Sequence, residues 1–348
     1  MQTFQCAKCG NGVYFENSRC LACDSPLGFD PAQMTLETLE RAEDGTFRRL
    51  SDANGPAVYC DNVHHSVCNW LTDGNDRNGL CVACDLNRTI PNLGEAGNVA
   101  AWATLERAKK RLVYSLMRFG LPLQGTAAVQ RPLMFDFPRD ATTGHLDGVI
   151  TIDVNETDPV ERERQRTQLE EGYRSVLGHM RHEVGHYYWM LLVDQSPHID
   201  GFRALFGDER ADYGAALGKH YASGPPPDWQ ADHVSSYASA HPWEDWSETW
   251  AHYLHMVDAL ETAEAVGMEP RAARFAPGSV WNFARQDVYR AVSFDDLVDR
   301  WLPLTVALNS INRSMGHADF YPFVISKVAR SKLAFVHSVV RGAGGGTP

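Results

Sequence analysis

The spacing of hydrophobic residues changes along the chain and predicts two kinds of element. From about Val99 to Phe119, hydrophobic residues recur every three or four positions, which predicts a helix that Gly120 would end. Leu133–Phe137 and Gly148–Val154 alternate between hydrophobic and polar residues, as strands do. The chain after about Val288 again has helical spacing. The pattern therefore predicts helices together with a small amount of sheet.

Two predicted helices carry a hydrophobic stripe on one side and possible metal ligands on the other. The first runs from about Tyr173 to Val193, and His182 and His186 lie about 200° around it from the stripe. The second begins at Pro242, a residue suited to a first helical turn. The two stripes are Tyr173, Leu177, Met180, Val184, Tyr187 and Leu191, and Trp246, Trp250, Tyr253, Val257 and Leu260. Opposite the second stripe lie Glu244, Glu248 and His252.

The pentapeptide His182-Glu183-Val184-Gly185-His186 is an H-E-x-x-H motif on the first of these helices. Its two histidines are one turn apart, so both rings can reach a single Zn²⁺, and Glu183 can take a proton from water held there. Catalytic zinc uses three protein ligands and keeps one position for water. The third ligand is expected in the segment from Tyr237 to His252, where the candidates are Glu244, Asp245, Glu248 and His252.

Composition excludes several other classes of protein. No run of 18 or more apolar residues occurs among the 348 residues, which predicts that no segment spans a membrane. The formal charge of -12 disfavours nucleic-acid binding, which needs Lys and Arg to neutralise phosphates. The first residues do not resemble a secretory signal, so we expect a cytoplasmic protein with reduced cysteines.

The eight cysteines all precede residue 85 and form two groups of four. Cys6, Cys9, Cys20 and Cys23 have the C-x2-C-x10-C-x2-C spacing of a zinc ribbon. Cys60, Cys68, Cys81 and Cys84 form a second candidate zinc site. The first half of that site, C-x7-C, is irregular, and His64 or His65 could replace a cysteine. Bound zinc would stabilise a region that has few large apolar residues.

Two long motifs resemble those of a known family. They are His-Glu-Val-Gly-His-Tyr-Tyr-Trp from residue 182 and His-Pro-Trp-Glu-Asp-Trp-Ser-Glu-Thr-Trp-Ala-His-Tyr-Leu-His from residue 241. The spacing of Tyr237, Glu244 and Glu248 resembles that of gluzincin peptidases, and within them the anthrax lethal factor-like group. Together with the cysteine groups, nearly the whole chain resembles a bacterial family of zinc-binding metallopeptidases with an amino-terminal zinc ribbon.

The resemblance implies an α+β fold, with a mostly helical zincin-like (gluzincin) catalytic domain, a small sheet and preceding zinc-ribbon modules. It implies His182, His186 and Glu244 as zinc ligands and Glu183 as general base. Tyr237 would stabilise the oxyanion, and Glu248 would orient a histidine ligand. The expected boundaries are 1–30 for the zinc ribbon, 31–95 for the second four-cysteine module, 96–341 for the peptidase domain and 342–348 for a disordered tail.

These observations predict a peptidase with one catalytic zinc and up to two structural zinc ions. Its substrate would be a peptide or protein, bound along an edge strand for which 148–154 is the candidate. The zinc ribbons could recruit a protein partner. Two alternatives stay open: a zinc-stabilised adaptor with little turnover, and a zinc hydrolase of non-peptide amides.

Overall fold

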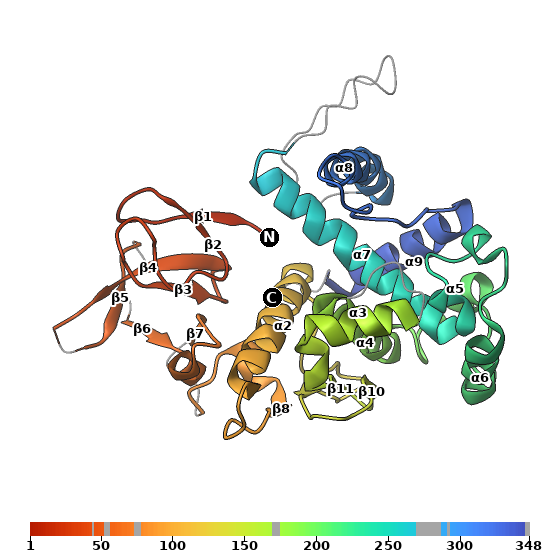
Figure 1. Ribbon diagram of the computed structural model, residues 1–348, viewed down its shortest axis with the longest axis horizontal. Coiled ribbons are helices and arrows are strands. Elements are labelled where there is room, and N and C mark those ends of the chain that lie inside the picture. Colours follow the sequence, from red (N-terminus) through yellow and green to blue (C-terminus); the bar gives the residue numbers. More distant parts are fainter. Residues whose placement is uncertain are drawn as a thin grey trace, which may run out of the picture. The chain divides into compact units, whose positions relative to one another are not determined.

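The computed structural model describes residues 1–43, 45–51, 56–72, 78–168, 175–268, 287–290 and 293–344. The chain divides into two compact units (Figure 1). The first consists of Met1–Tyr114, Met134–Gly144 and Val149–Asp158, and the second of Ser115–Leu133, His145–Gly148 and Pro159–Pro348. Helices and strands both contribute, as the expected α+β class requires.

The cysteine-rich region contains more sheet than the sequence predicts. Strands β1 (Thr3–Gln5) and β2 (Gly12–Tyr14) form an antiparallel pair. A five-stranded antiparallel sheet follows, formed by β3 (Leu27–Asp30), β4 (Thr35–Arg41), β5 (Phe47–Arg49), β6 (Pro56–Tyr59) and β7 (Leu71–Thr72). Phe29 and Trp70 are fully buried with ring centroids 4.8 Å apart. This region therefore has a small aromatic core in addition to its cysteines.

A second sheet has the strand order β10-β11-β9-β8. Its members are β8 (Asn87–Thr89), β9 (Met134–Asp136), β10 (Gly144–Leu146) and β11 (Val149–Thr151), and β9 runs parallel to both β8 and β11. Strands were correctly predicted near β9 and β11. The suggestion that 148–154 is an edge strand is wrong, because β11 has a partner on each side. Among the described residues, β10 is the edge next to it.

Helix α2 (Asn98–Phe119) begins one residue before the predicted start, ends at the predicted residue and buries a row of leucines. Leu105, Leu112 and Leu116 are completely inaccessible to solvent. Gly120 has a φ of 71° immediately after the helix, a left-handed conformation that costs glycine little. The short elements before and after α2 are η1 (Asp61–His65), α1 (Val82–Asp85) and η2 (Val154–Thr157).

The second unit is a group of helices around α4 (Val176–Leu192) and α7 (Pro242–Ala265) (Figure 1). The side chain of Ser175 accepts a bond from the backbone of Gly178 and so caps α4. His241 caps α7 in the same way, with Pro242 in the first turn as predicted. The other helical elements are α3 (Pro159–Gln168), α5 (Ile199–Phe206), α6 (Tyr213–Ser223), η3 (Trp229–Ala231) and η4 (Tyr237–Ala240).

The glycine of the H-E-x-x-H motif allows α4 and α7 to approach closely. A Cβ atom on Gly185 would lie 3.0 Å from both Cα and Oγ of Ser247. The indole nitrogen of Trp246 donates a hydrogen bond of 2.9 Å to the carbonyl of Gly185. Backbone contact at this point fixes the register of α4 against α7, and therefore the positions of the side chains on both helices.

The carboxyl-terminal region is helical, as predicted, with α8 (Phe294–Ser314) and α9 (Lys327–Gly344). Helix α9 continues three residues into the segment 342–348 that was expected to be disordered, and 345–348 lie outside the described residues. Tyr173, the first residue of the predicted stripe, also lies outside them. No helix in the described part of the chain combines the length and apolar composition that a membrane crossing needs.

Candidate metal centre

His182 and His186 project from α4, and Glu244 projects from the first turn of α7. All three side chains are buried, with exposed fractions of 7%, 4% and 1%. The amino-terminal turn of a helix favours a carboxylate, because the helix dipole is positive there. The tight packing at Gly185 brings the two helices together at this level.

The three side chains are spaced as ligands of one metal ion would be. Oε2 of Glu244 lies 3.0 Å from Nε2 of His182 and 3.6 Å from Nε2 of His186. Nitrogen and oxygen ligands about 2.0–2.1 Å from a tetrahedral Zn²⁺ are separated by about 3.3 Å, which lies between these distances. The ligand atoms of this group all lie within 4.8 Å of one another.

The two oxygens of Glu244 have different surroundings. Oε1 accepts a hydrogen bond of 2.6 Å from the hydroxyl of Tyr213. Oε2 is buried and makes no hydrogen bond in the described part of the chain. A buried carboxylate oxygen without a donor is costly unless a cation satisfies it. The residues present therefore fit a metal ion at Oε2.

Glu248 holds the ring of His182 in one orientation. Its Oε1 lies 2.7 Å from Nδ1 of His182, and its Oε2 accepts a bond of 2.5 Å from the hydroxyl of Ser235. Because a carboxylate can only accept, Nδ1 of His182 carries the proton, which leaves Nε2 free for a metal. Burial raises the pKa of Glu248, but the bond and charge of His182, the charge of His252 and the bond from Ser235 together lower it to about 2.

The electrostatics of this group also call for a cation. Burial lowers the pKa of His182, but the bonds and charges of Glu244 and Glu248 together have the larger effect. The pKa of His182 therefore stands well above its ordinary value. Burial raises the pKa of Glu244, yet the nearby rings of His186 and His182 hold it well below the ordinary value. Without a metal, protonated His182 therefore lies between two ionised carboxylates, and a divalent cation would take the place of the proton on Nε2.

The structure places Glu183 and Tyr237 beside these histidines. Oε1 of Glu183 lies 3.5 Å from Nε2 of His179, and Glu183 is 6% exposed. Burial raises the pKa of Glu183, but His179, His182 and His186 together lower it below its ordinary value. Tyr237 begins η4, with its ring centroid 5.8 Å from that of His182. Burial, followed by the charge of Glu244, raises the pKa of Tyr237.

The alternative third ligands are engaged elsewhere. Asp245 accepts a bond of 2.6 Å from Nζ of Lys332. Nδ1 of His252 lies 2.6 Å from the hydroxyl of Tyr321. Glu248 contacts His182 through Nδ1, on the side of the ring away from Glu244. The group of residues able to share one ion contains none of these three.

The sequence analysis missed two residues near the group. Tyr213 reaches Glu244 from the first turn of α6, and no spacing relative to the motif predicts that contact. His145 lies on β10, its ring stacked against that of His186 with centroids 6.3 Å apart. Burial, with the charge of His186, lowers the pKa of His145 to about 4. A single histidine within a three-residue strand carries no comparable signal in the sequence.

Both cysteine groups have the separations of tetrahedral zinc sites. In the first, Sγ of Cys6 lies 3.6 Å from Sγ of Cys23, and Cys9 and Cys20 are equally far apart. In the second, the sulfurs of Cys68 and Cys81 are 3.7 Å apart. Sulfurs about 2.3 Å from Zn²⁺ are about 3.8 Å apart, whereas a disulfide bond measures about 2.05 Å. All eight cysteines are free, and each group of four could hold one ion.

The described part of the chain has one zinc-type site between two helices and, separately, two groups of four cysteines. These three sites are typical of a zinc-binding metalloprotein, and comparison with known families gives the same class. Residues 98–339 match the family described as "Putative zinc-binding metallo-peptidase", and residues 3–95 match a zinc-ribbon domain. The chain belongs to this zinc-binding metallopeptidase family. The family resemblance predicted from the sequence is therefore confirmed.

Curated relatives align with this chain over nearly their whole length but add no activity. Uncharacterized proteins of Mycobacterium bovis and of two Mycobacterium tuberculosis strains are 41% identical to this chain over 348 residues. The alignment covers 98% of this chain and 95% of each relative. No solved structure matches the chain. The finer resemblance to gluzincins and to the lethal factor-like group therefore stays a prediction.

Proposed function

We propose that this protein is a zinc-dependent peptidase. Its catalytic metal would be held by His182, His186 and Glu244, and Glu183 would act as the general base. The two cysteine groups would hold structural zinc ions. The free cysteines accord with the cytoplasmic location that the sequence favours.

The observation that carries this proposal is the position of Oε2 of Glu244. This buried atom has no hydrogen-bond donor among the residues that the structure describes, and it lies 3.0 Å and 3.6 Å from the Nε2 atoms of two histidines one helical turn apart. A histidine pair and one carboxylate are the ligands that zinc peptidases use. Histidines serving only as packing residues would not place both Nε2 atoms around the same unsatisfied oxygen.

Each residue of the site would have a separate role in peptide hydrolysis. Zinc bound at this site supplies Lewis acidity and lowers the pKa of a water molecule toward about 7. Glu183 takes the proton of the attacking water and delivers it to the leaving amine. The hydroxyl of Tyr237 donates to the oxyanion. Glu248 keeps the ring of His182 oriented throughout.

An extended peptide would bind along the edge of β10. This strand ends the order β10-β11-β9-β8, and its Leu146 is 76% exposed. The neighbouring His145 lies next to His186, so a peptide paired with this strand would pass close to the candidate metal ligands. A peptide or protein substrate fits this arrangement better than a small amide, which needs no strand edge.

The decisive experiment compares the native protein with Glu183→Gln. The variant keeps all proposed metal ligands, so it should retain its zinc and lose hydrolysis of a peptide library and of cellular peptides. Glu264→Gln is a matched control, because Glu264 is at the other end of α7 and pairs with Arg300. Equal cleavage by the native protein and Glu183→Gln would exclude Glu183 as base. A zinc-loaded native protein that cleaves no peptide would favour an adaptor role.

A further inference from the structure

The second cysteine group is enclosed in the protein, unlike the first. Cys60, Cys68, Cys81 and Cys84 are at most 6% exposed, whereas Cys9 of the first group is exposed. Four thiolates around one divalent ion have a net charge of −2. Removing such a charge from water is costly unless positive charge lies nearby. The surroundings of the second group should therefore contain a cation.

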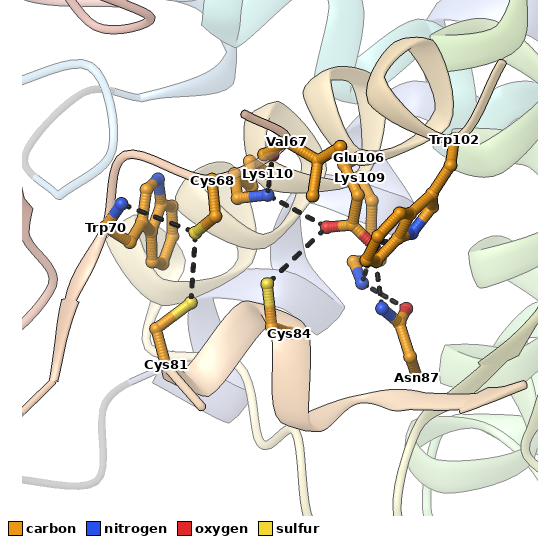
Figure 2. A network of polar contacts seen from close by, with 10 residues as sticks. All are labelled: Val67, Cys68, Trp70, Cys81, Cys84, Asn87, Trp102, Glu106, Lys109 and Lys110. Atoms are coloured by element: carbon orange, nitrogen blue, oxygen red, sulfur yellow. Dashed lines mark hydrogen bonds and ion pairs between the residues drawn. The ribbon is translucent and has the colours of Figure 1, made fainter. Parts of the chain in front are cut away.

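Helix α2 supplies a buried carboxylate next to this group, Glu106 (Figure 2). Its Oε1 accepts bonds from the indole of Trp102 at 3.1 Å, the amide of Asn87 at 2.7 Å and Nζ of Lys109 at 2.8 Å. Its Oε2 accepts a bond of 2.9 Å from Nζ of Lys110 and lies 3.8 Å from Sγ of Cys84. Two ammonium groups, an indole and an amide therefore all donate to this one carboxylate beside the sulfur of Cys84.

Two lysines contact Glu106. The charge of the first, Lys109, is balanced without the cysteine sulfurs. It is completely buried, and its Nζ donates to Glu106 and to the side-chain oxygen of Asn87. The same Nζ lies 5.7 Å and 5.6 Å from the ring centroids of Phe135 and Phe137, within the range of cation–π attraction. Lys109 and Glu106 therefore form a neutral pair.

Because Lys109 neutralises Glu106, the positive charge of Lys110 remains available to the nearby cysteine sulfurs. It is 3% exposed, and its Nζ donates to Oε2 of Glu106 and, at 2.9 Å, to the carbonyl of Val67, the residue before Cys68. Figure 2 shows its ammonium between the loop of Cys68 and the side of Cys84. Burial lowers the pKa of Lys110, but Glu106 and then Cys68, Cys84 and Cys81 raise it well above the ordinary value.

We propose that Lys110 is the counter-cation of a metal centre formed by Cys60, Cys68, Cys81 and Cys84. Glu106 holds Lys110 in place, so metal binding at the cysteines also fixes the first half of α2. The residues up to Tyr114, which include this half of α2 and all four cysteines, belong to one compact unit. The inference does not depend on peptidase activity, because it concerns only the second cysteine site.

The test varies the buried charge and measures metal affinity site by site. In the full-length chain loaded with cadmium, each four-sulfur site gives its own cadmium NMR signal, which Cys9→Ser assigns. A competing chelator is then titrated. The formal charges at positions 106, 109 and 110 sum to +1 in the native protein, to 0 in Lys110→Met and to +2 in Glu106→Gln. In the double variant, which carries both substitutions, they again sum to +1. Arg107→Met is the control, because Arg107 is exposed on the same helix.

Lys110→Met should weaken the second site by about tenfold or more and leave the first site unchanged, since one charge is lost beside a desolvated anion. The double variant should recover most of that loss, although it lacks more hydrogen bonds. A second site unaffected by Lys110→Met, or a double variant weaker than both single variants, would overturn the proposal. If Lys110→Met does not fold, Lys110→Arg should bind metal as the native protein does and Lys110→Gln should not. An equal loss of metal affinity in Lys110→Arg and Lys110→Gln would also overturn the proposal.

Hydrogen exchange provides a second measurement. Removing the metal from the second site should increase amide exchange between residues 102 and 110 of α2, because Lys110, which Glu106 holds in place, loses its anionic partner. Cys9→Ser, which disables the first site, should leave these amides protected. Unchanged protection of α2 after loss of the second metal would show that the helix and the cysteine site are independent.

Discussion

The hydroxyl of Tyr213 donates a hydrogen bond of 2.6 Å to Oε1 of Glu244. This bond occupies one oxygen of the carboxylate and leaves Oε2 directed at the two histidines. Tyr213 belongs to α6, which has no buried residue, so an exposed helix contributes directly to the orientation of a buried ligand. The candidate metal centre thus depends on three helices, α4, α6 and α7, rather than on the two that the sequence motifs identify.

Tyr213→Phe should lower zinc affinity at the candidate catalytic site. Partners that orient a metal ligand contribute about 10–100-fold to affinity, and this variant removes one hydrogen bond without changing the ring. Competition with a chelator measures the loss, and a cobalt-substituted sample shows the changed geometry in its visible spectrum. Tyr14→Phe, at an exposed tyrosine, is the control. A spectrum and affinity equal to the native values would show that Tyr213 does not orient Glu244.

The sequence predicted the centre of this site because its residues follow helical spacing. His182 and His186 are separated by one turn, and Glu244 lies opposite a tryptophan stripe, so helix geometry alone limits where they point. Tyr213 and His145 reach the site through tertiary packing of α6 and β10. The spacing of residues along the sequence cannot predict such packing. The same reasoning explains why Lys110 was not recognised: its spacing in α2 is that of an ordinary helical residue.

The sheets were less predictable than the helices. Helix α2 extends over 22 residues, long enough for its period to be unmistakable. Strands β5 and β7 have three and two residues, so alternation cannot be recognised in either. Whether β11 was an edge or an internal strand depended on β10, a three-residue strand that a turn at residues 147–148 joins to β11. Strand order is a tertiary property and was beyond the pattern of the sequence.

Zinc counting tests the metal sites together. The native chain should contain close to three zinc ions, and His186→Ala should contain two, because two remaining ligands hold a catalytic zinc poorly. Elemental analysis of dialysed protein gives the count. A chelator should remove the ion at His182 and His186 before the four-sulfur ions. An unchanged zinc content in His186→Ala would contradict the assignment of His186 as a ligand.

Gly185→Ala should destabilise the packing of α4 against α7. The added Cβ would lie 3.0 Å from Cα of Ser247, a backbone atom that cannot move without shifting α7. Overpacking of this kind costs about 1–3 kcal/mol of unfolding free energy, which denaturant titration measures. The control is Gly218→Ala on α6, where a Cβ would meet nothing within 4 Å. Equal stability of the two variants would mean that α4 and α7 do not pack as described.

A last prediction concerns His337 on α9, well away from the candidate metal ligands in sequence. Its Nδ1 lies 3.0 Å from the hydroxyl of Tyr253, and burial, with the charge of Arg341, lowers its pKa to about 4. In the unfolded chain the pKa is about 6.5. Between these values the unfolded state binds more protons than the folded state. The stabilising contribution of neutral His337 is therefore complete above about pH 6.5 and is lost as the pH falls toward 4.

The variant His337→Asn cannot take up this proton and should lose less stability than the native protein between pH 6.5 and 4. Because His337 is only partly buried, the difference should be about 1 kcal/mol rather than the larger value of a fully desolvated group. Urea unfolding in excess zinc at several pH values measures it and limits the effect of metal loss. His317→Asn, at an exposed histidine, should follow the native protein. Parallel pH curves for the native protein and His337→Asn would show that His337 keeps its unfolded-state titration in the native fold.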